Sequence, residues 1–341
     1  MARSKRRSSA YNYPGLFDKL YSEPVDKEAN IGNDIVAEGG TDDMIEEDGE
    51  TELIKTVPES SNTILKYISF GSGSSGNCSY LGNDRYGILI DAGIDPKKVE
   101  SDMERHGLDM YKVIGIVITH DHHDHVSHVY GFLKKYRHMA VFCTPRMLNG
   151  MLRRHGISSR IKDYHRPIYK EIPFNIKDFS LTAFEVNHDG SDNVGYYIQF
   201  QHHSFVVATD LGIIGERALF YMQQATAMML ESDYDLQMLV NGHYPEHLKA
   251  RIRSERGHLS NKQVAEFLQQ YWEAKLTHIF LCHLSKDNNS PQKALQSAAQ
   301  ALIAAGAGSV GNGSNDISNR EAPVQLVALP RFDASPLFYI R

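Results

Sequence analysis

The stretch THDHHDHVSH (119–128) places five histidines and two aspartates within ten residues. It directly follows GIVI (115–118), an apolar run typical of a buried strand. Side chains at the carboxyl end of such a strand point into the crevice where α/β proteins place their sites. We therefore expect the stretch to form part of a binding site.

The spacing H-x-H-x-D-H is met by His120, His122, Asp124 and His125. Two residues apart on an extended loop, the first two imidazoles can converge on one metal ion. The other two residues begin a helix and can face a second ion close by. Neutral imidazole and carboxylate are ligands that suit Zn²⁺, Mn²⁺ or Fe²⁺.

The remaining polar residues of the stretch are expected to bind no metal. Asp121 and His123 occupy the x positions and should point away from both ions. His128 follows about one helical turn later and is expected on the helix surface or behind the ligands.

Three later residues follow predicted strands and extend the ligand set. His188, after FEV, would complete the first site with His120 and His122. Asp210, after VVAT, could bridge both ions, and His283, after IFLC, would complete the second site. Each residue alone is ambiguous between core and function, but together they predict a two-metal centre.

Composition limits the class of protein. The most apolar run in the 341 residues, VIGIVIT (113–119), is too short to span a membrane. The basic start MARSKRRSS lacks a following apolar region, so we do not expect a secretory signal. Three cysteines, Cys78, Cys143 and Cys282, are too few for a disulfide framework and favour the cytoplasm.

The net charge of −6 is concentrated at the start of the chain. Residues 1–62 hold 14 acids and 7 bases, leaving 28 acids and 29 bases for 63–341. The first segment is acidic and poor in core-forming residues beyond its first 21 positions, so we interpret 1–62 as a flexible extension. The neutral remainder is compatible with a polyanionic substrate.

From Thr63 onward, strand-like runs alternate with helical segments, which predicts one α/β domain over 63–341. The expected strands cover 64–70, 87–91, 113–119, 140–143, 179–186, 194–200, 204–209, 227–230, 278–282 and 324–329. The expected helices cover 96–107, the segment after Asp124, 145–156 with Thr144 as N-cap, a segment starting at Ser260 with a capping box, and 290–306. The Gly/Ser/Asn-rich stretch 306–319 is expected to be a surface loop.

The histidine motif and the later His, Asp and His resemble the metallo-β-lactamase superfamily, and within it the YycJ/WalJ-type branch. The segments that carry the resemblance are SFGSGSSGNCSYLG (69–82), ILIDAGI (88–94), VITHDHHDH (117–125), FEVNHDGSDNVGYYI (184–198), FVVATDLG (205–212), YPEHLKARIRSERGHLSN (244–261) and LCHLSKDNNSP (281–291). The resemblance covers nearly all of 64–341. It implies a four-layer αββα sandwich, two Zn²⁺ or Mn²⁺ ions between the sheets, and DNA exonuclease activity, 5′ to 3′.

The resemblance also implies supporting residues. Asp91 would orient a ligand histidine, although a turn-capping role is nearly as plausible. Asp124, Glu231 and His258 would act in catalysis. The last two would form a proton-delivering pair, as in the related RNase Z. The alternative for His258 is a hydrogen bond to a phosphate oxygen.

Substrate contacts are expected around these groups. In the Gly-rich loop, Ser74, Ser75 and Asn77 are plausible pocket residues. Basic side chains near a metal centre suit phosphate, so Arg253 and Arg256 are candidates, with a solvated helix face as the alternative. After His283, we expect contacts from Lys286 and Asn288. The basic clusters at 134–138 and 146–156 could extend a DNA track, but we interpret them as solvated helix surfaces.

The resulting hypothesis is a metal-dependent phosphodiesterase, specifically a DNA exonuclease that uses a hydroxide bridging two ions. A hydrolase of small esters, thioesters or lactams on the same fold is the main alternative. A redox di-iron protein is less consistent, because position 122 is His where that class typically uses Glu. A binding module without activity is disfavoured, because every ligand position is filled.

We predict that deleting residues 1–62 leaves the rest of the chain folded and active on short DNA, because the extension contributes no metal ligand. Thermal unfolding and cleavage of a minimal oligonucleotide measure both properties. A collapse of either would contradict the assignment of 1–62 as an extension.

Overall fold

The computed structural model describes residues 64–314, 319 and 321–340. The proposed extension, 1–62, lies outside this part of the chain.

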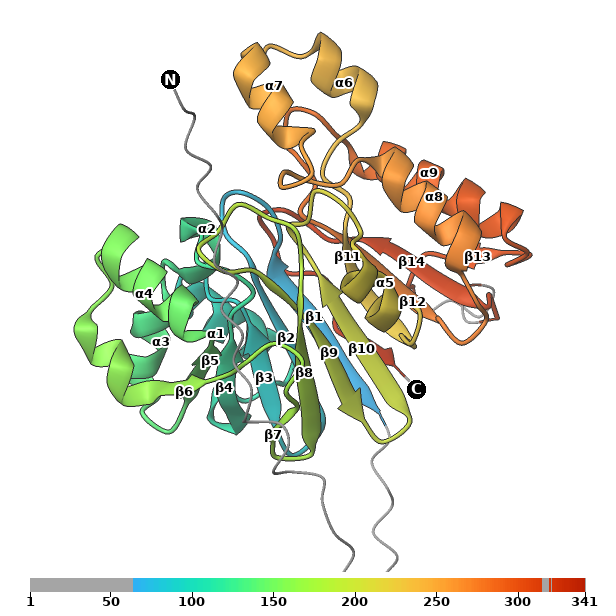
Figure 1. Ribbon diagram of the computed structural model, residues 1–341. Coiled ribbons are helices and arrows are strands. Elements are labelled where there is room, and N and C mark those ends of the chain that lie inside the picture. Colours follow the sequence, from blue (N-terminus) through green and yellow to red (C-terminus); the bar gives the residue numbers. More distant parts are fainter. Residues whose placement is uncertain (1–63, 315–318, 320, 341) are drawn as a thin grey trace, which may run out of the picture. The chain divides into compact units, whose positions relative to one another are not determined.

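Two mixed β-sheets form the centre of the domain (Figure 1). The first has the order β15-β1-β2-β3-β4-β5-β6, with β15 (Phe338–Ile340), β1 (Leu65–Gly71), β2 (Cys78–Gly82), β3 (Gly87–Ile90), β4 (Val113–Val117), β5 (Ala140–Cys143) and β6 (His165–Pro167). The second has the order β13-β14-β12-β11-β10-β9-β8-β7, with β13 (Val310–Gly311), β14 (Val324–Ala328), β12 (His278–Cys282), β11 (Ala227–Glu231), β10 (His203–Ala208), β9 (Val194–Phe200), β8 (Phe179–Glu185) and β7 (Phe174–Ile176).

The two sheets pack face to face through aromatic side chains. Tyr67 of β1 lies 5.1 Å from Phe205 of β10 and 4.4 Å from Phe280 of β12, measured between ring centroids. All three residues are fully buried, so they remove large apolar areas from water at the centre of the domain.

Helices cover the outer faces of both sheets (Figure 1). On the first sheet they are α1 (Pro96–Arg105), α3 (Val129–Lys135) and α4 (Pro145–Arg154); on the second they are α5 (Glu216–Met222), α8 (Asn261–Tyr271) and α9 (Pro291–Ala304). This four-layer αββα arrangement confirms the predicted fold class. None of the described helices is long and apolar enough to cross a membrane.

Local sequence signals set the helix starts as predicted. Thr144 accepts a hydrogen bond from the Met147 amide, with Pro145 in the first turn of α4. Ser260 and Gln263 form the reciprocal capping box of α8. These caps satisfy amide groups that the helices themselves leave unpaired.

One excursion leaves the second sheet between β11 and α8. It contains α6 (Leu236–Asn241) and α7 (Glu246–Ile252), which lie together away from the sheets in Figure 1. The excursion closes on itself, because the Asp233 amide donates to the Leu259 carbonyl and the Asn261 amide donates to the Tyr234 carbonyl.

Parallel strands bring several chain segments to the same end of the sandwich. The strands β10, β11 and β12 are mutually parallel, and β3 is parallel to β4. Asp91 and His283, directly after β3 and β12, and Asp210, two residues after the end of β10, have φ values of 60°, 55° and 55° respectively. This left-handed conformation is unfavourable for a residue with a Cβ, and such residues concentrate at functional sites.

The ten predicted strands are present within two residues of their expected ends, but other elements were missed. The strand β2 was not predicted, because it follows directly on the Gly/Ser-rich loop. The prediction of a surface loop over 306–319 was wrong in part, since Val310 and Gly311 pair with β14 as β13. A strand of two residues has no periodicity and is defined only by its partner.

Candidate metal centre

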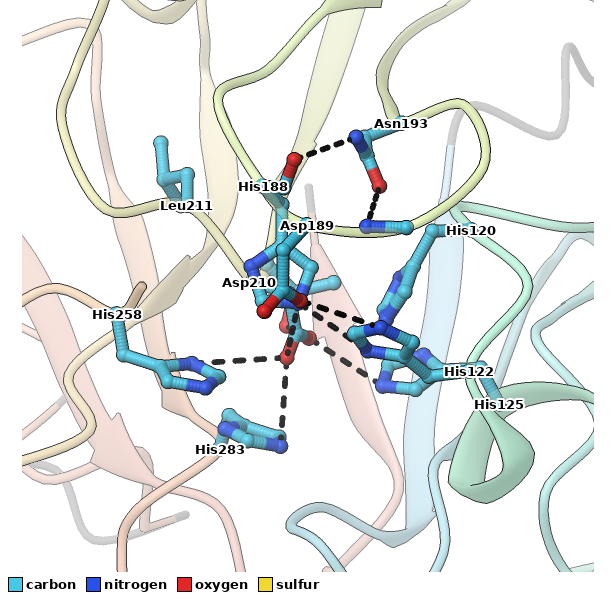
Figure 2. A network of polar contacts seen from close by, with 12 residues as sticks. His120, His122, His125, His188, Asp189, Asn193, Asp210, Leu211, His258 and His283 are labelled. Atoms are coloured by element: carbon cyan, nitrogen blue, oxygen red, sulfur yellow. Dashed lines mark hydrogen bonds and ion pairs between the residues drawn. The ribbon is translucent and has the colours of Figure 1, made fainter. Parts of the chain in front are cut away.

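Three histidines form one half of a cluster at the carboxyl ends of the strands (Figure 2). The ligand atoms of His120, His122 and His188 lie within 4.8 Å of one another. The His188 Nε2 atom is 3.2 Å from the His122 Nδ1 atom. Its other nitrogen, Nδ1, is 3.0 Å from the Gly257 carbonyl oxygen, which leaves Nε2 to face the cluster.

The second half consists of Asp124, His125 and His283, again within 4.8 Å of one another. Asp210 lies between the two halves (Figure 2). Its Oδ2 atom is 3.3 Å from the His125 Nε2 atom, and its Oδ1 atom is 3.5 Å from His283 Nε2 and 3.9 Å from His188 Nε2. A carboxylate with oxygens facing both groups could bridge two ions.

The unpaired atoms of the cluster fit a metal site. His120 Nε2 is buried and makes no hydrogen bond within the part of the chain that the structure describes, and the ring nitrogens of His283 have carboxylate oxygens only at 3.4 to 3.8 Å. A buried polar atom without a partner is costly, and a metal ion would remove that cost. Imidazole nitrogens and carboxylate oxygens are also the donor set that divalent Zn²⁺ or Mn²⁺ accepts.

Electrostatics divide the histidines into two kinds. Burial lowers the pKa of His120 and His188, and it lowers the pKa of His122 to about 4. Burial also opposes protonation of His125 and His283, but nearby carboxylates outweigh it and raise the pKa of each.

The carboxylates respond in the opposite direction. Burial disfavours ionisation of Asp210 and Asp124, yet neighbouring histidines keep the pKa of both below the usual range. The cluster therefore holds Asp124 and Asp210 in the ionised form, which is the form that binds a divalent cation.

Asp91 fixes the loop that carries the motif. Its Oδ2 atom accepts a hydrogen bond of 2.8 Å from His125 Nδ1, and its Oδ1 atom accepts one of 2.8 Å from the Thr119 amide. These bonds orient the His125 ring so that Nε2 faces Asp210. Of the two roles considered for Asp91, the geometry matches ligand orientation.

A further carboxylate–imidazole pair borders the cluster. His258 Nδ1 lies 2.6 Å from the Glu231 Oε1 atom, and the His258 ring stacks on His283 with centroids 5.1 Å apart. Burial opposes protonation, but the Glu231 carboxylate outweighs it and raises the pKa of His258 to about 9. Glu231 itself is fully buried.

Residues 86–279 match the model of a beta-lactamase superfamily domain. The chain is 31% identical over 244 residues to exodeoxyribonuclease YycJ of Bacillus anthracis, covering 72% of this chain and 91% of that protein. It is 30% identical over 247 residues to exodeoxyribonuclease WalJ of Streptococcus pneumoniae, covering 72% and 90%.

The chain belongs to the metallo-β-lactamase superfamily. The predicted resemblance and the predicted hydrolase class are thereby confirmed. Metallo-β-lactamase fold proteins bind divalent metal, in agreement with the His/Asp cluster.

Solved structures support the fold. The metallo-β-lactamase fold protein YhfI of Bacillus subtilis aligns with a TM-score of 0.57 at 11% identity, over 80% of this chain and 99% of that one. Zn²⁺-bound PqqB of Methylobacterium extorquens aligns with a TM-score of 0.50 at 14% identity, over 79% and 99%.

None of the candidate metal groups among the described residues includes Asp121, His123 or His128, the polar residues of the motif expected to bind no metal. Asp121 is buried and accepts hydrogen bonds of 2.7 Å from the amide and the hydroxyl of Ser191. The exposed His123 ring lies 5.6 Å from His155, between centroids. His128 precedes α3 as its N-cap residue.

The predicted substrate residues separate into exposed and buried groups. The exposed ones are Ser74, Ser75, Arg253, Arg256 and Lys286. Asn77 is buried instead, and its Nδ2 atom lies 3.2 Å from Asp124 Oδ2 and 2.9 Å from His125 Nε2. It therefore contacts two of the predicted metal ligands and supports their placement.

The expectation that Asn288 contacts substrate does not agree with its position. Its side chain is 1% exposed. The Nδ2 atom lies 3.5 Å from the Ser285 hydroxyl, and the Oδ1 atom faces Gly242. Asn288 packs beneath α6, so its side chain is not accessible to a substrate.

Two polar residues of the site were missed by sequence reasoning. Asp189 lies 3.2 Å from His122 Nε2 and 2.7 Å from Arg251 Nε, and its place directly after His188 was an available signal. Arg331 donates to Ser74 Oγ at 3.2 Å and to the Leu284 carbonyl, across 257 and 47 residues of sequence. No local sequence pattern predicts a contact between residues so far apart in the chain.

We predict that Asp210→Ala reduces bound metal to one ion or none, because its two oxygens face both halves of the cluster. Elemental analysis of the purified variant measures this, together with loss of hydrolysis. Two tightly bound ions in the variant would contradict the bridging assignment.

The matched control is His123→Ala, which removes a histidine from the same motif. Its exposed ring faces His155 and not the cluster, so metal content should stay near wild type. Loss of metal there would show that the motif had been assigned in the wrong register.

Proposed function

We propose that this protein is a two-metal phosphodiesterase that acts as a DNA exonuclease, with residues 63–341 as its catalytic domain. Both sequence relatives are named exodeoxyribonucleases, and the alignments cover nine tenths of their length. The proposed ligands are His120, His122 and His188 for one ion and Asp124, His125 and His283 for the other, with Asp210 shared.

The His258–Glu231 pair beside the metal cluster carries the proposal. Cleavage of a phosphodiester releases an alkoxide, which leaves readily only when it receives a proton. His258 Nδ1 is occupied by Glu231 at 2.6 Å, so the Nε2 atom is available to deliver that proton. The side chain of His258 is 15% exposed, which gives the ring access to a bound substrate.

The other residues of the proposed site bind the metal ions and the substrate or hold the metal ligands in place. When bound, two divalent ions would activate a water molecule and neutralise charge on the phosphate. Asp91 and Asn77 hold the motif residues in place. Exposed Arg253, Arg256 and Lys286 supply positive charge for flanking phosphates, and Arg256 is fixed by a 3.2 Å hydrogen bond from its Nε to the His188 carbonyl.

Zn²⁺ or Mn²⁺, 5′-to-3′ polarity and a cytoplasmic location complete the proposal. The ligand set contains only nitrogen and oxygen donors, which both metals accept.

The first experiment is digestion of 5′- and 3′-labelled DNA, single- and double-stranded, with Mn²⁺ and Zn²⁺ in parallel. We expect stepwise release of nucleotides from the 5′ end. A thioester and a lactam in the same screen provide the comparison. Hydrolysis of either without cleavage of any DNA would overturn the proposed function in favour of a small-molecule hydrolase.

We predict that His258→Ala lowers the cleavage rate of ordinary DNA by about 10²- to 10⁴-fold, the usual contribution of a positioned general acid. A nitrophenyl phosphodiester, whose leaving group needs no proton, should regain most of the lost rate. Metal content, measured alongside, should stay intact. An equal loss on both substrates would make His258 a phosphate-binding residue.

A further inference from the structure

The outer face of α4 carries a concentration of positive charge. Between positions 145 and 166 the chain has six Lys or Arg residues and a single Asp, whereas the whole chain is net negative. In α4 itself, Arg146, Asn149 and Arg153 follow one another at helical spacing and share a face. All three are exposed.

These side chains line a hollow of about 340 Å³, together with Gly150, Arg154 and Ser191. Arg146 and Arg153 form no ion pair with any residue that the structure describes, and Arg154 lies 3.9 Å from the Asp121 carboxylate. Here at least two guanidinium groups retain their full set of donors, which match phosphate oxygens.

The hollow adjoins the metal centre through one short loop. His188 belongs to the cluster, and three residues later Ser191 lines the hollow while donating two hydrogen bonds to Asp121. Asp192 accepts a hydrogen bond of 2.8 Å from Thr144, the N-cap of α4. The loop 188–193 is thus bonded at one end to the cluster and at the other to the helix that carries the arginines.

The cluster is accessible beside this loop. His122 and Asp189 retain 26% and 29% side-chain exposure, and Asp124 in the other half retains 22%, whereas the remaining proposed ligands are nearly fully buried. Gly150 keeps α4 close to the motif, because a Cβ there would collide with the Asp121 carboxylate. A strand leaving the cluster past His122 and Asp189 would next meet the arginine hollow.

We propose that the arginine hollow binds the sugar–phosphate backbone of the DNA strand beyond the cleaved nucleotide. This inference rests on the proposed nuclease function and adds a binding subsite to it. The contacts are to phosphate, so the hollow increases affinity for longer strands without selecting a base sequence. It favours the DNA track over the solvated helix surface, the two interpretations considered for 146–156.

The test compares Arg146→Gln/Arg153→Gln with wild type in binding a fluorescent, phosphorothioate single-stranded 20-mer, which is cleaved slowly. Each lost phosphate contact lowers affinity about fivefold at 0.1 M salt, so Kd should rise about 25-fold. The slope of log Kd against log salt should fall by about 1.4. Turnover of a dinucleotide, too short to reach the hollow, should remain unchanged.

The matched control is Lys262→Gln/Lys275→Gln, which removes the same charge from exposed positions in and after α8, over the other sheet. Its Kd and salt slope should stay near wild type. Unchanged Kd and salt slope in the arginine variant would overturn the inference, and this is the result expected if the hollow binds a protein instead. Equal losses of affinity in the control would overturn it as well. Absence of DNA cleavage by wild type would overturn the nuclease proposal separately, since the binding measurement does not require turnover.

Discussion

The hydrogen bond between Asp91 and His125 connects the end of β3 to the ligand motif that follows β4, and the geometry of the site depends on this connection. Asp91 ends β3 with a left-handed backbone and directs its carboxylate across to the loop that follows β4. By accepting from Thr119 and His125, that carboxylate fixes both the start and the end of the ligand motif. Without it, the buried His125 ring would lose the bond that determines which nitrogen faces the cluster.

The cluster between the sheets is a balance of burial and charge. Burial keeps His120, His122 and His188 neutral, whereas nearby carboxylates favour protonation of His125 and His283. Such an arrangement is unfavourable in an apolar interior unless cations complete it. The left-handed backbone of Asp91, Asp210 and His283 is a second source of unfavourable energy, and the packing of the surrounding sheets holds these residues in place.

Much of this arrangement could be predicted from local sequence. The motif spacing, the apolar runs before each ligand and the caps at Thr144 and Ser260 are all patterns within a few residues. The burial of Asn288 could not be predicted, because it depends on how α6 packs over it. The Arg331–Ser74 contact joins residues 257 positions apart, and only the closed sandwich brings them together.

The excursion that holds α6 and α7 has its own consequence. Backbone hydrogen bonds join its first residues, Asp233 and Tyr234, to its last, Leu259 and Asn261. The number of residues between them can therefore change without moving β11 or α8. It carries Arg253, Arg256 and His258, while the proposed metal ligands lie elsewhere in the chain. Gly257 and His258, near its end, contact His188 and Glu231, so only the part that holds α6 and α7 can be exchanged without disturbing the cluster.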